Sequence, residues 1–332
     1  MINRSQEEIT QNWRKDWNEP LLSIRCIVFN HEEYIAQALD GFLMQETNFP
    51  FEVIVHDDAS TDKTTDIIRE YELKYPKIIK PIYEKENMYS KHDGSISRIM
   101  RDACKGKYLA FCEGDDYWTD SKKIQRQVDF LERNLDYALS SENGLVLYTK
   151  SGNVEPFSNE KTRDYTLDDL LIKRRFPTAS VVIRREYTLD PLFLNMQWDT
   201  MIWGFLAQRG KVHFEPIMSS VYRRGSGVTE SNKIAWAKTS ERINCMVNTF
   251  FKPTKKVRLA RNKILFYDYK SAWKVAIRQH LFCNAIKFCL KMMSISPKLF
   301  VKDLVVTIIK NKIVFLRTRF WRLYYSIVPA KK

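Results

Sequence analysis

Two kinds of segment alternate along the first 135 residues, and this alternation restricts the fold more than any other feature. Short apolar runs, typical of buried strands, lie at residues 22–29, 51–55, 78–83 and 108–112. Stretches with helical spacing of apolar residues follow them, at residues 32–43, 64–75, 94–104 and 122–133. The alternation predicts an α/β fold with a mostly parallel sheet and helices on both faces.

The pattern loosens after residue 136. We expect a strand pair or hairpin at 138–148, short strands at 180–183, 212–214 and 218–222, and helices at 166–173 and 200–208. From residue 231 onward we expect helices, with the clearest amphipathic stretches at 272–293 and 298–325. The predicted organisation is a lead-in (1–20), an α/β domain (21–230) and a basic helical extension (231–332).

Charge separates the extension from the rest of the chain. The sequence holds 54 Lys and Arg against 40 Asp and Glu, and residues 231–332 alone contain 23 of the bases but only three acids. A basic amphipathic helix with aromatic residues, as at 310–325, is typical of a membrane-surface segment. The partner of the extension is therefore expected to be an anionic membrane surface. A helical hairpin packed on the α/β domain with a solvated basic face is the alternative, and no recognised nucleic-acid module is present.

Other sequence features bear on location. Residues 1–20 are polar, unlike a signal peptide, and no run of about 18 apolar residues exists, so a soluble or peripheral protein is expected. The six cysteines form no CxxC pair, which predicts reduced, buried thiols in the cytoplasm.

Acidic residues follow two of the predicted strands. Asp57-Asp58 ends the second strand, and Glu113-Gly114-Asp115-Asp116 follows the fourth. The carboxyl ends of parallel strands are where ligands bind in such sheets. Crowded carboxylates suit a divalent cation that also holds a diphosphate. Solvated turn acids that cap the helices at 64 and 122 are the alternative.

Three segments together resemble family 2 glycosyltransferases, particularly bacterial members that build capsule, O-antigen or exopolysaccharide. They are residues 23–35, 55–64 and 106–118, in the order and spacing of that family. The resemblance extends over about residues 20–230. It implies a GT-A fold with a nucleotide-sugar half (21–135) and an acceptor half (136–230).

The resemblance assigns the donor nucleotide to the strand ends. Asp58 would hydrogen-bond the pyrimidine base, with Asp57 supporting the strand end. Phe29 would pack on the base, in a place where the family often has tyrosine. Asn30 lies on the same nucleotide-binding side, and Asn30 or His31 is also expected to cap the following helix.

The second acidic motif stands in the place of the family's DXD motif. Asp115 would hold Mn²⁺ or Mg²⁺ against the diphosphate, and Asp116 would contact the donor sugar or support the metal. Glu113 stands in the place of the first Asp of that motif, and the resemblance implies that it would contact the ribose. A divalent cation stabilises the charge of the departing nucleoside diphosphate.

An inverting transfer also needs a base for the acceptor hydroxyl. Asp199 lies in a segment that resembles the family's catalytic-base segment, although Asp199 could also be only the N-cap of the helix at 200–208. Nearby Trp198, and Thr178 and Ser180 in another segment, would face the acceptor; the two hydroxyl residues could simply begin a strand. Trp203 is expected in the core.

Two cations are candidates for the diphosphate. Arg224 lies in a Gly-rich segment where the family often has His, and Lys91 is a weaker candidate. For both, a solvated surface position is the alternative interpretation.

These patterns predict an inverting enzyme that moves a sugar from a nucleotide donor, with UDP expected, to a saccharide or lipid-linked saccharide in surface polysaccharide synthesis. It would act at the inner face of the cytoplasmic membrane. Because Glu113 and the missing His depart from the family, a non-catalytic binding subunit at the membrane is the alternative. A nucleic-acid-binding protein is a third, weaker hypothesis.

Overall fold

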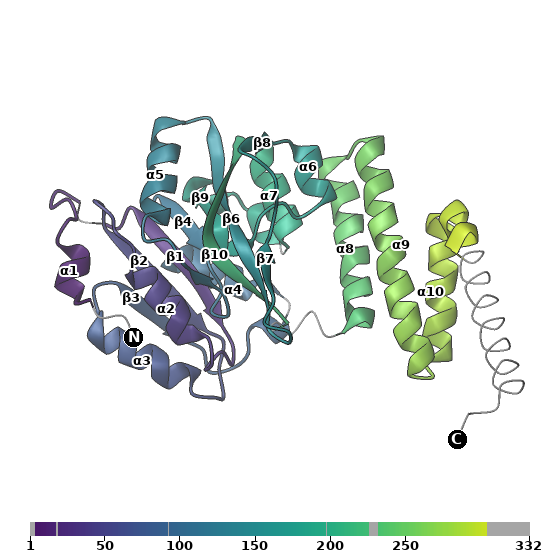
Figure 1. The fold of residues 1–332 in the computed structure, drawn as a ribbon, viewed down its shortest axis with the longest axis horizontal. Coiled ribbons are helices and arrows are strands. Elements are labelled where there is room, and N and C mark those ends of the chain that lie inside the picture. The colour runs from purple at the N-terminus through teal and green to yellow at the C-terminus, as the bar shows by residue number, and fades with distance from the viewer. Residues whose placement is uncertain (1–3, 18, 92, 197, 226–231, 304–332) are drawn as a thin grey trace, which may run out of the picture. The chain divides into compact units, whose positions relative to one another are not determined.

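A mixed sheet organises the first part of the chain in the computed structural model, which describes residues 4–17, 19–91, 93–196, 198–225 and 232–303. Within these residues the sheet has ten strands, with the order β3-β2-β1-β4-β9-β6-β10-β5, while β7 pairs with β6 and β8 with β10 (Figure 1). Their bounds are β1 Leu22–Val28, β2 Phe51–Asp57, β3 Ile79–Tyr83, β4 Tyr108–Phe111, β5 Tyr117–Trp118, β6 Tyr137–Tyr148, β7 Val154–Pro156, β8 Arg163–Tyr165, β9 Val181–Arg184 and β10 Lys211–Arg224.

Parallel strand pairing is concentrated in the part of the chain where predicted strands and helices alternate. The neighbours β3, β2, β1 and β4 are all parallel. The antiparallel strand β9 then joins β4 to β6, and β6 is parallel to β10. The predicted α/β fold with a mostly parallel sheet is thus confirmed, with antiparallel strands added in its second half.

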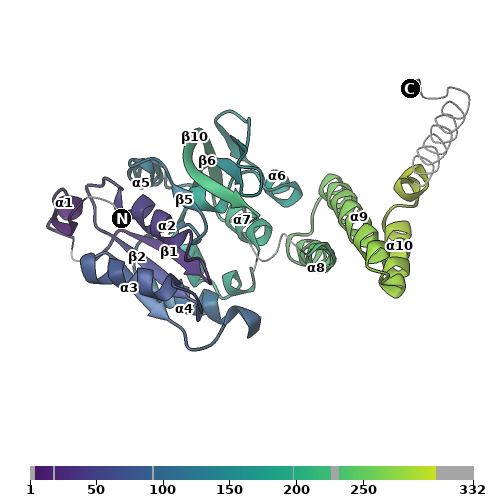
Figure 2. The ribbon, with the colours of Figure 1, turned by 60° about the horizontal axis from the view of Figure 1, so that its bottom comes forward.

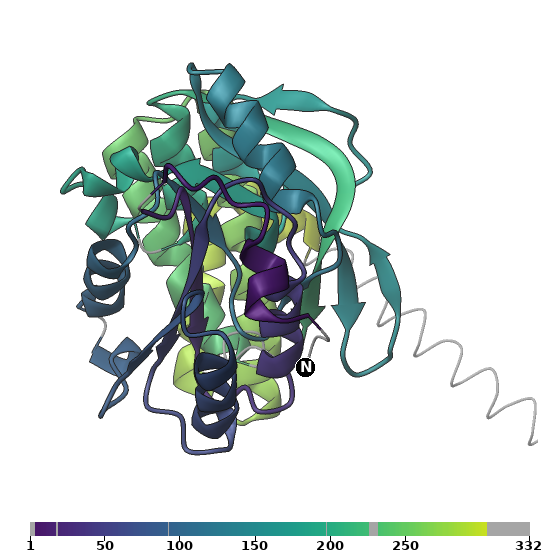
Figure 3. The same cartoon turned by 90° about the vertical axis from the view of Figure 1, so that its left-hand side faces the viewer.

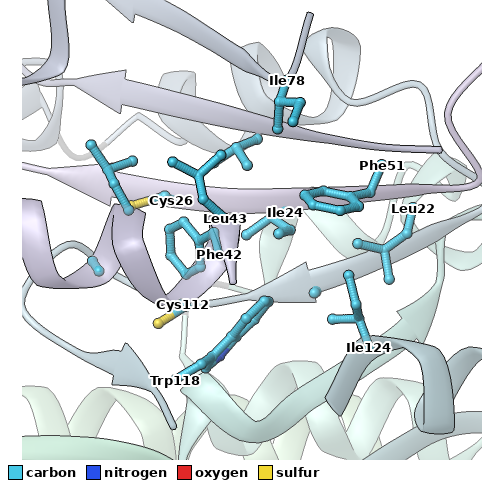
Figure 4. Close-up of a cluster of buried hydrophobic side chains, with 14 of the residues drawn as sticks. Leu22, Ile24, Cys26, Phe42, Leu43, Phe51, Ile78, Cys112, Trp118 and Ile124 are labelled. Atoms are coloured by element: carbon cyan, nitrogen blue, oxygen red, sulfur yellow. The ribbon is translucent and has the colours of Figure 1, made fainter. Parts of the chain in front are cut away.

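Helices connect and cover the strands, as Figures 1 and 3 show. In the first part of the chain they are α1 Gln6–Thr10, α2 Ile35–Leu43, α3 Thr64–Lys74, α4 Ser95–Ala103, α5 Lys123–Arg133, α6 Leu167–Ile172 and α7 Asp199–Ala207. One face of α2, with Phe42 and Leu43, packs on Leu22, Ile24 and Cys26 of β1 in the main core (Figure 4). Burying these apolar faces is the main stabilising contribution, at roughly 25 cal/mol per Å².

Two expected breaks in the sheet are absent. Residues 138–148 belong to a single strand, β6, and not to a hairpin. Residues 212–214 and 218–222 are parts of one strand, β10, whose pairing with β6 is irregular between Glu215 and Met218. The strand therefore passes Pro216 through a bulge, which is where a strand tolerates proline.

The cap expected for the first long helix is also wrong. α2 begins at Ile35, and its N-cap is Tyr34, which makes no side-chain capping bond. Asn30 instead has a positive φ of 55°, and its side chain bonds to another loop.

Most of the described residues beyond 231 are helical. The helices are α8 Lys233–Phe251, α9 Lys255–Arg278 and α10 Phe282–Ile295, and residues 297–303 are helical again. The single amphipathic stretch expected at 272–293 is interrupted, because the chain turns at His280, whose φ is 56°. Most of the stretch expected at 298–325 lies outside the described residues.

The chain divides into two compact units. The first comprises residues 1–231 and 246–257, and the second comprises residues 232–245 and 258–332. In the second unit α9 and α10 lie side by side (Figures 1 and 2), around a small core that includes Phe266, Tyr269, Phe288 and Met292. No helix among the described residues combines the length and hydropathy needed to cross a membrane.

The cysteines depart from the expectation of burial. Cys26, Cys104 and Cys112 are buried, but Cys245 and Cys283 are exposed and Cys289 is half-buried. The last three lie on α8 and α10, where the sequence pattern did not distinguish buried from exposed positions.

Candidate active site

The loops that follow β1 and β2 are joined by hydrogen bonds between side chains and backbone. The Thr61 N–H donates to Asn30 Oδ1 over 2.7 Å, and the Asn30 N–H donates to Ser60 Oγ over 3.0 Å. Further along, the Glu32 N–H donates to Asp62 and the Lys63 N–H donates to Glu32. The two loops therefore hold each other at the carboxyl edge of the sheet.

Asp57 and Asp58 are both buried but serve different neighbours. Asp57 accepts from the Ser60 N–H at 3.0 Å and from the Thr65 hydroxyl at 2.5 Å, so it supports the turn after β2. Asp58 accepts from the Met88 and Tyr89 N–H groups at 2.6 and 3.0 Å. Asp58 therefore fixes the segment that leads to Lys91, and neither aspartate caps α3.

The acidic turn, residues 113–116, is tied to β1. Glu113 accepts from the Ile27 N–H at 3.2 Å and lies 3.5 Å from the Arg25 guanidinium. Gly114 has no room for a side chain, since an added Cβ would lie 2.2 Å from Val28 Cγ1. The turn can approach the strand this closely only because residue 114 is glycine.

The acidic turn crowds negative charge. Burial raises the pKa of Glu113 to about 7; Arg25 opposes this shift, whereas Asp115 and Asp199 add to it. Burial and the Asp115 carboxylate also raise the pKa of Asp116 well above its ordinary value. A bound cation would relieve this repulsion.

Arg223 connects the acidic turn to β10. The backbone N–H of Arg223 donates to Asp116 Oδ1 over 2.8 Å, and its side-chain Nη1 donates to the Asp115 carbonyl over 2.5 Å. The guanidinium also bonds Gln37 of α2. It stacks between the rings of Tyr34 and Tyr117, 4.8 and 4.6 Å from their centroids. Arg223 is only 6% exposed, so it is built into the site.

Asp199 is the first residue of α7, after the N-cap Trp198. Its Oδ2 accepts from the Thr178 hydroxyl at 2.7 Å and lies 3.3 Å from Arg174 Nε. Arg174 also donates to Thr178 over 2.9 Å, so the three side chains form a closed triangle. In this arrangement Oδ2 is occupied, while Oδ1 accepts no hydrogen bond from the described residues.

Asp199 is linked to the acidic turn both electrostatically and through side-chain contacts. The Asp199 carboxylate contributes to the raised pKa of Glu113, and Arg174 opposes the raised pKa of Asp116. Contacts also connect the two, since the Arg174 guanidinium lies 4.8 Å from the centroid of the Tyr222 ring, and the backbone N–H of the next residue, Arg223, donates to Asp116. Segments 83 residues apart in sequence, from Asp116 to Asp199, thus meet at the same place.

Comparison with known sequences finds a family model that matches part of the chain. Residues 23–144, which contain β1, β2, β4 and the acidic turn, match the model of glycosyl transferase family 2. This part of the chain is therefore similar to glycosyltransferase family 2.

Two curated proteins are similar in sequence to parts of this chain. It is 40% identical over 210 residues to an uncharacterized protein of Mycobacterium tuberculosis, covering 61% of this chain and 58% of that protein. It is 35% identical over 112 residues to UDP-Glc:alpha-D-GlcNAc-diphosphoundecaprenol beta-1,3-glucosyltransferase WfaP of Escherichia coli, covering 34% of this chain and 41% of WfaP. This chain thus spans less than two thirds of either protein.

Solved structures share the fold of this chain. Residues 1–349 of TarS from S. aureus, in complex with UDP-GlcNAc, superpose with a TM-score of 0.61 at 15% identity, covering 84% of this chain and 82% of that one. The mannosyltransferase PcManGT from Pyrobaculum calidifontis, in complex with GDP-Man and Mn²⁺, superposes with a TM-score of 0.53 at 14% identity, covering 95% and 89%. The expected GT-A fold is confirmed.

The other residues singled out from the family pattern lie in varied surroundings. Phe29 is half-buried and Asn30 exposed. Lys91 pairs with Glu86 at 2.5 Å. Arg224 is exposed, with its Nη1 3.1 Å from the Tyr148 hydroxyl.

On the expected acceptor side, Thr178 and Trp198 lie beside Asp199, but Ser180 does not present its hydroxyl. Ser180 is fully buried and donates to the Pro177 carbonyl over 2.8 Å. The buried Trp203 lies in the core, as expected.

Sequence reasoning selected Arg224 and missed Arg223. A signal was available, since alternate residues of a strand face the same side. Val221 and Arg223 are buried, whereas Tyr222 is half-buried and Arg224 exposed. Because Val221 is apolar and expected to face the core, residue 223, two positions later on the same strand, could have been predicted to face inward as well. Arg174 was also missed, and its sequence context, Lys173-Arg174-Arg175, carries no comparable signal.

The site offers few protein ligands for a metal. Among the described residues, no group of three or more His, Cys, Asp or Glu is placed to hold an ion. This fits a cation such as Mg²⁺, which typically takes one or two carboxylates and completes its shell with water and substrate phosphates. The crowded carboxylates of the acidic turn fit such a cation.

Proposed function

We propose that this chain is an inverting glycosyltransferase that moves a sugar from a nucleoside-diphosphate donor, with UDP as the expected nucleotide, to a saccharide or lipid-linked saccharide. The observation that carries the proposal is the chain of contacts from Asp199 through Arg174 and the Tyr222 ring to Arg223 and the acidic turn. A base for the acceptor and a carboxylate cluster for the donor diphosphate are the two groups that such a transfer requires.

The donor nucleotide would bind at the ends of β1 and β2. Phe29 would pack on the base, and Asp58 would accept a hydrogen bond from it beside Asn30 and Asp57. Asp58 already accepts two backbone N–H groups, but a carboxylate has about four acceptor sites. Glu113 would contact the ribose, while Lys91 and Arg224 are proposed for the diphosphate.

Asp115 would hold Mn²⁺ or Mg²⁺ next to the diphosphate, and Asp116 would support it or contact the donor sugar. The structure of PcManGT holds Mn²⁺ together with a nucleotide sugar, which supports the same choice here. When bound, the cation would stabilise negative charge on the departing nucleoside diphosphate.

Asp199 would act as the base. Thr178 and Arg174 hold its Oδ2, which leaves Oδ1 to take the proton of the acceptor hydroxyl. The acceptor oxygen then bonds to the sugar C1 from the face opposite the diphosphate, and the C1–O bond to the diphosphate breaks. The product therefore has inverted configuration at C1. Trp198 and Thr178 would border the acceptor.

A lipid-linked acceptor fits the charge of the chain. The name of WfaP specifies a diphosphoundecaprenol-linked acceptor, and residues 231–332 of this chain are strongly basic. We therefore propose a peripheral location at the inner face of the cytoplasmic membrane, with surface polysaccharide synthesis as the process.

A nucleotide-release assay tests the proposal. The protein is incubated with Mn²⁺ or Mg²⁺ and a panel of UDP-, GDP- and dTDP-sugars, with and without lipid extract. Metal-dependent release of the nucleotide from one donor is expected.

Variants test the assigned residues in the same assay. Asp115→Ala and Asp199→Asn should each lower the rate by at least about 100-fold. Asp66 is an exposed residue of α3, and Asp66→Asn should retain the rate of wild type. Full activity of either site variant would refute the assignment. Tight nucleotide binding without turnover of any donor would instead favour the non-catalytic binding subunit.

A further inference from the structure

Helix α10 is apolar on two of its faces. One face, with Ala285, Phe288 and Met292, is buried. It belongs to the core of the second unit, together with Phe266 and Tyr269 of α9. These contacts account for the folding of α10, so its other apolar residues are not needed to fill that core.

The second apolar face is exposed along the whole helix. Phe282, Ile286, Leu290 and Met293 are 61%, 62%, 60% and 45% exposed. At about 100° per residue they fall within an arc of about 80°. Single exposed apolar residues are common on protein surfaces, but an aligned row of four large ones marks an interaction surface. We call these four residues the exposed row of α10.

Positive charge accompanies the exposed row. Lys287, Lys298 and Lys302 are exposed, and no Asp or Glu occurs from residue 282 to 302. The acids elsewhere in the described part of this unit are engaged, since Glu241 pairs with Lys291 and Asp303 with Lys270. Asp268 accepts from the Ser240 hydroxyl over 2.6 Å. The surroundings of the exposed row are therefore cationic.

We infer that the exposed row of α10 inserts into the headgroup region of an anionic bilayer, with α10 lying parallel to the membrane plane. An apolar face with lysines beside it is how interfacial helices bind, and each lysine near an anionic leaflet adds attraction. A second copy of the chain is a poorer occupant, because a two-fold contact would bring like-charged lysines together. The inference rests on the proposed membrane-linked function and names the residues that would carry it.

The test is vesicle binding by the full chain. Phosphatidylcholine vesicles with and without phosphatidylglycerol are sedimented with wild type, with an Ile286→Ser/Leu290→Ser variant and with a matched Leu73→Ser/Leu135→Ser control. Leu73 and Leu135 are 82% and 74% exposed and lie in the first unit. All four side chains are largely solvated, so none of these changes should unfold the protein. A Lys287→Glu/Lys298→Glu variant tests the charge independently.

Wild type and the control should bind the anionic vesicles and bind the neutral ones weakly. The row variant should lose at least about tenfold of the partition coefficient, and the lysine variant should lose the preference for anionic lipid. Undiminished binding by the row variant would overturn the inference. So would a failure of wild type to bind anionic vesicles. Sedimentation that shows the exposed row to support only self-association of the chain would overturn it as well. Donor hydrolysis without acceptor is measured on the same samples. If it persists while vesicle binding is absent, the surface inference fails and the proposed chemistry stands; loss of hydrolysis in Asp115→Ala with vesicle binding intact leaves the surface unaffected.

Discussion

The backbone N–H of Arg223 donates to Oδ1 of Asp116 over 2.8 Å, while the Arg223 guanidinium reaches the carbonyl of Asp115. The last strand of the sheet thereby sets the position of the acidic turn. Removing the side chain would release the turn but leave the backbone bond.

Arg223→Ala should therefore lower kcat by roughly 10- to 100-fold, because hydrogen bonds to a charged group contribute about 1.5–3 kcal/mol. Arg223→Lys should restore only part of the loss, since an ammonium group cannot reproduce the forked contacts of a guanidinium. Steady-state kinetics with the active donor provide the measurement. The control is Arg133→Ala, whose side chain is 77% exposed on α5. Equal activity of Arg223→Ala and the control would contradict the positioning role.

Thr178→Val should lower kcat by roughly 10- to 100-fold with little change in the KM of the donor. The change removes the hydroxyl that holds Asp199 Oδ2, and a hydrogen bond to a charged group contributes about 1.5–3 kcal/mol. Thr178→Ser keeps the donor and should recover most of the rate. A failure of serine to recover activity would indicate that the methyl group, and not the hydroxyl, matters.

Glu113 should make stability depend on pH. Its pKa in the folded chain is raised to about 7, so between the ordinary value of 4.5 and 7 the folded state binds more protons than the unfolded state. The stability that Glu113 contributes is present at low pH and is lost as the pH rises towards 7. Relative to wild type, Glu113→Gln should gain about 1–2 kcal/mol between pH 5 and pH 8, a value reduced for partial solvation of the side chain.

Urea unfolding at these two pH values measures the effect. Glu70→Gln, at an exposed position of α3, provides the control and should follow wild type. A constant difference between Glu113→Gln and wild type across the range would contradict the raised pKa.

Gly114→Ala should destabilise the chain by about 1–3 kcal/mol, because the new methyl group would collide with Val28 Cγ1 and overpacking has a cost of this size. Val28→Ala creates space at the same place. In a double-mutant cycle by thermal unfolding, the two changes together should therefore cost less than the sum of the single changes. Strict additivity would show that the two positions do not meet.

Lys123 should give a stability effect of opposite sign at higher pH. It is fully buried, with its Nζ 2.5 Å from Gln127 Oε1, and burial lowers its pKa to about 8. Between pH 8 and 10.5 the unfolded state binds more protons, so wild type should gain up to about 3 kcal/mol relative to Lys123→Met as the pH rises from 8 to 10. Comparing unfolding of the two proteins at these pH values checks the sign.

The strand ends were predictable because they depend on local pattern and on one topological rule. Buried runs followed by acids identify the carboxyl edge of a parallel sheet, and Asp57, Asp58 and the acidic turn all lie there. The middle of β6 was not predictable in this way. Ser140, Ser141 and Glu142 resemble a turn, yet they are buried. Two of them have partners from other elements: Ser141 donates to the His213 carbonyl, and Glu142 pairs with Arg126.

The same limit applies to single residues in the site. Asn30 was expected to cap α2 because a cap is a local feature, but its side chain bonds Thr61 in another loop. Arg174 reaches Asp199 only after the chain has folded. No glycine or proline lies next to His280, so the sequence gives no signal for the break between α9 and α10.

The interlocked loops after β1 and β2 have a consequence for engineering. Since Asn30 bonds both Ser60 and Thr61, and Glu32 bonds both Asp62 and Lys63, neither loop keeps its shape if the other is exchanged. An attempt to change the preferred nucleotide by grafting a loop from a relative would have to transplant both segments as a pair, and chimaeras that move only one should lose donor affinity whatever its source.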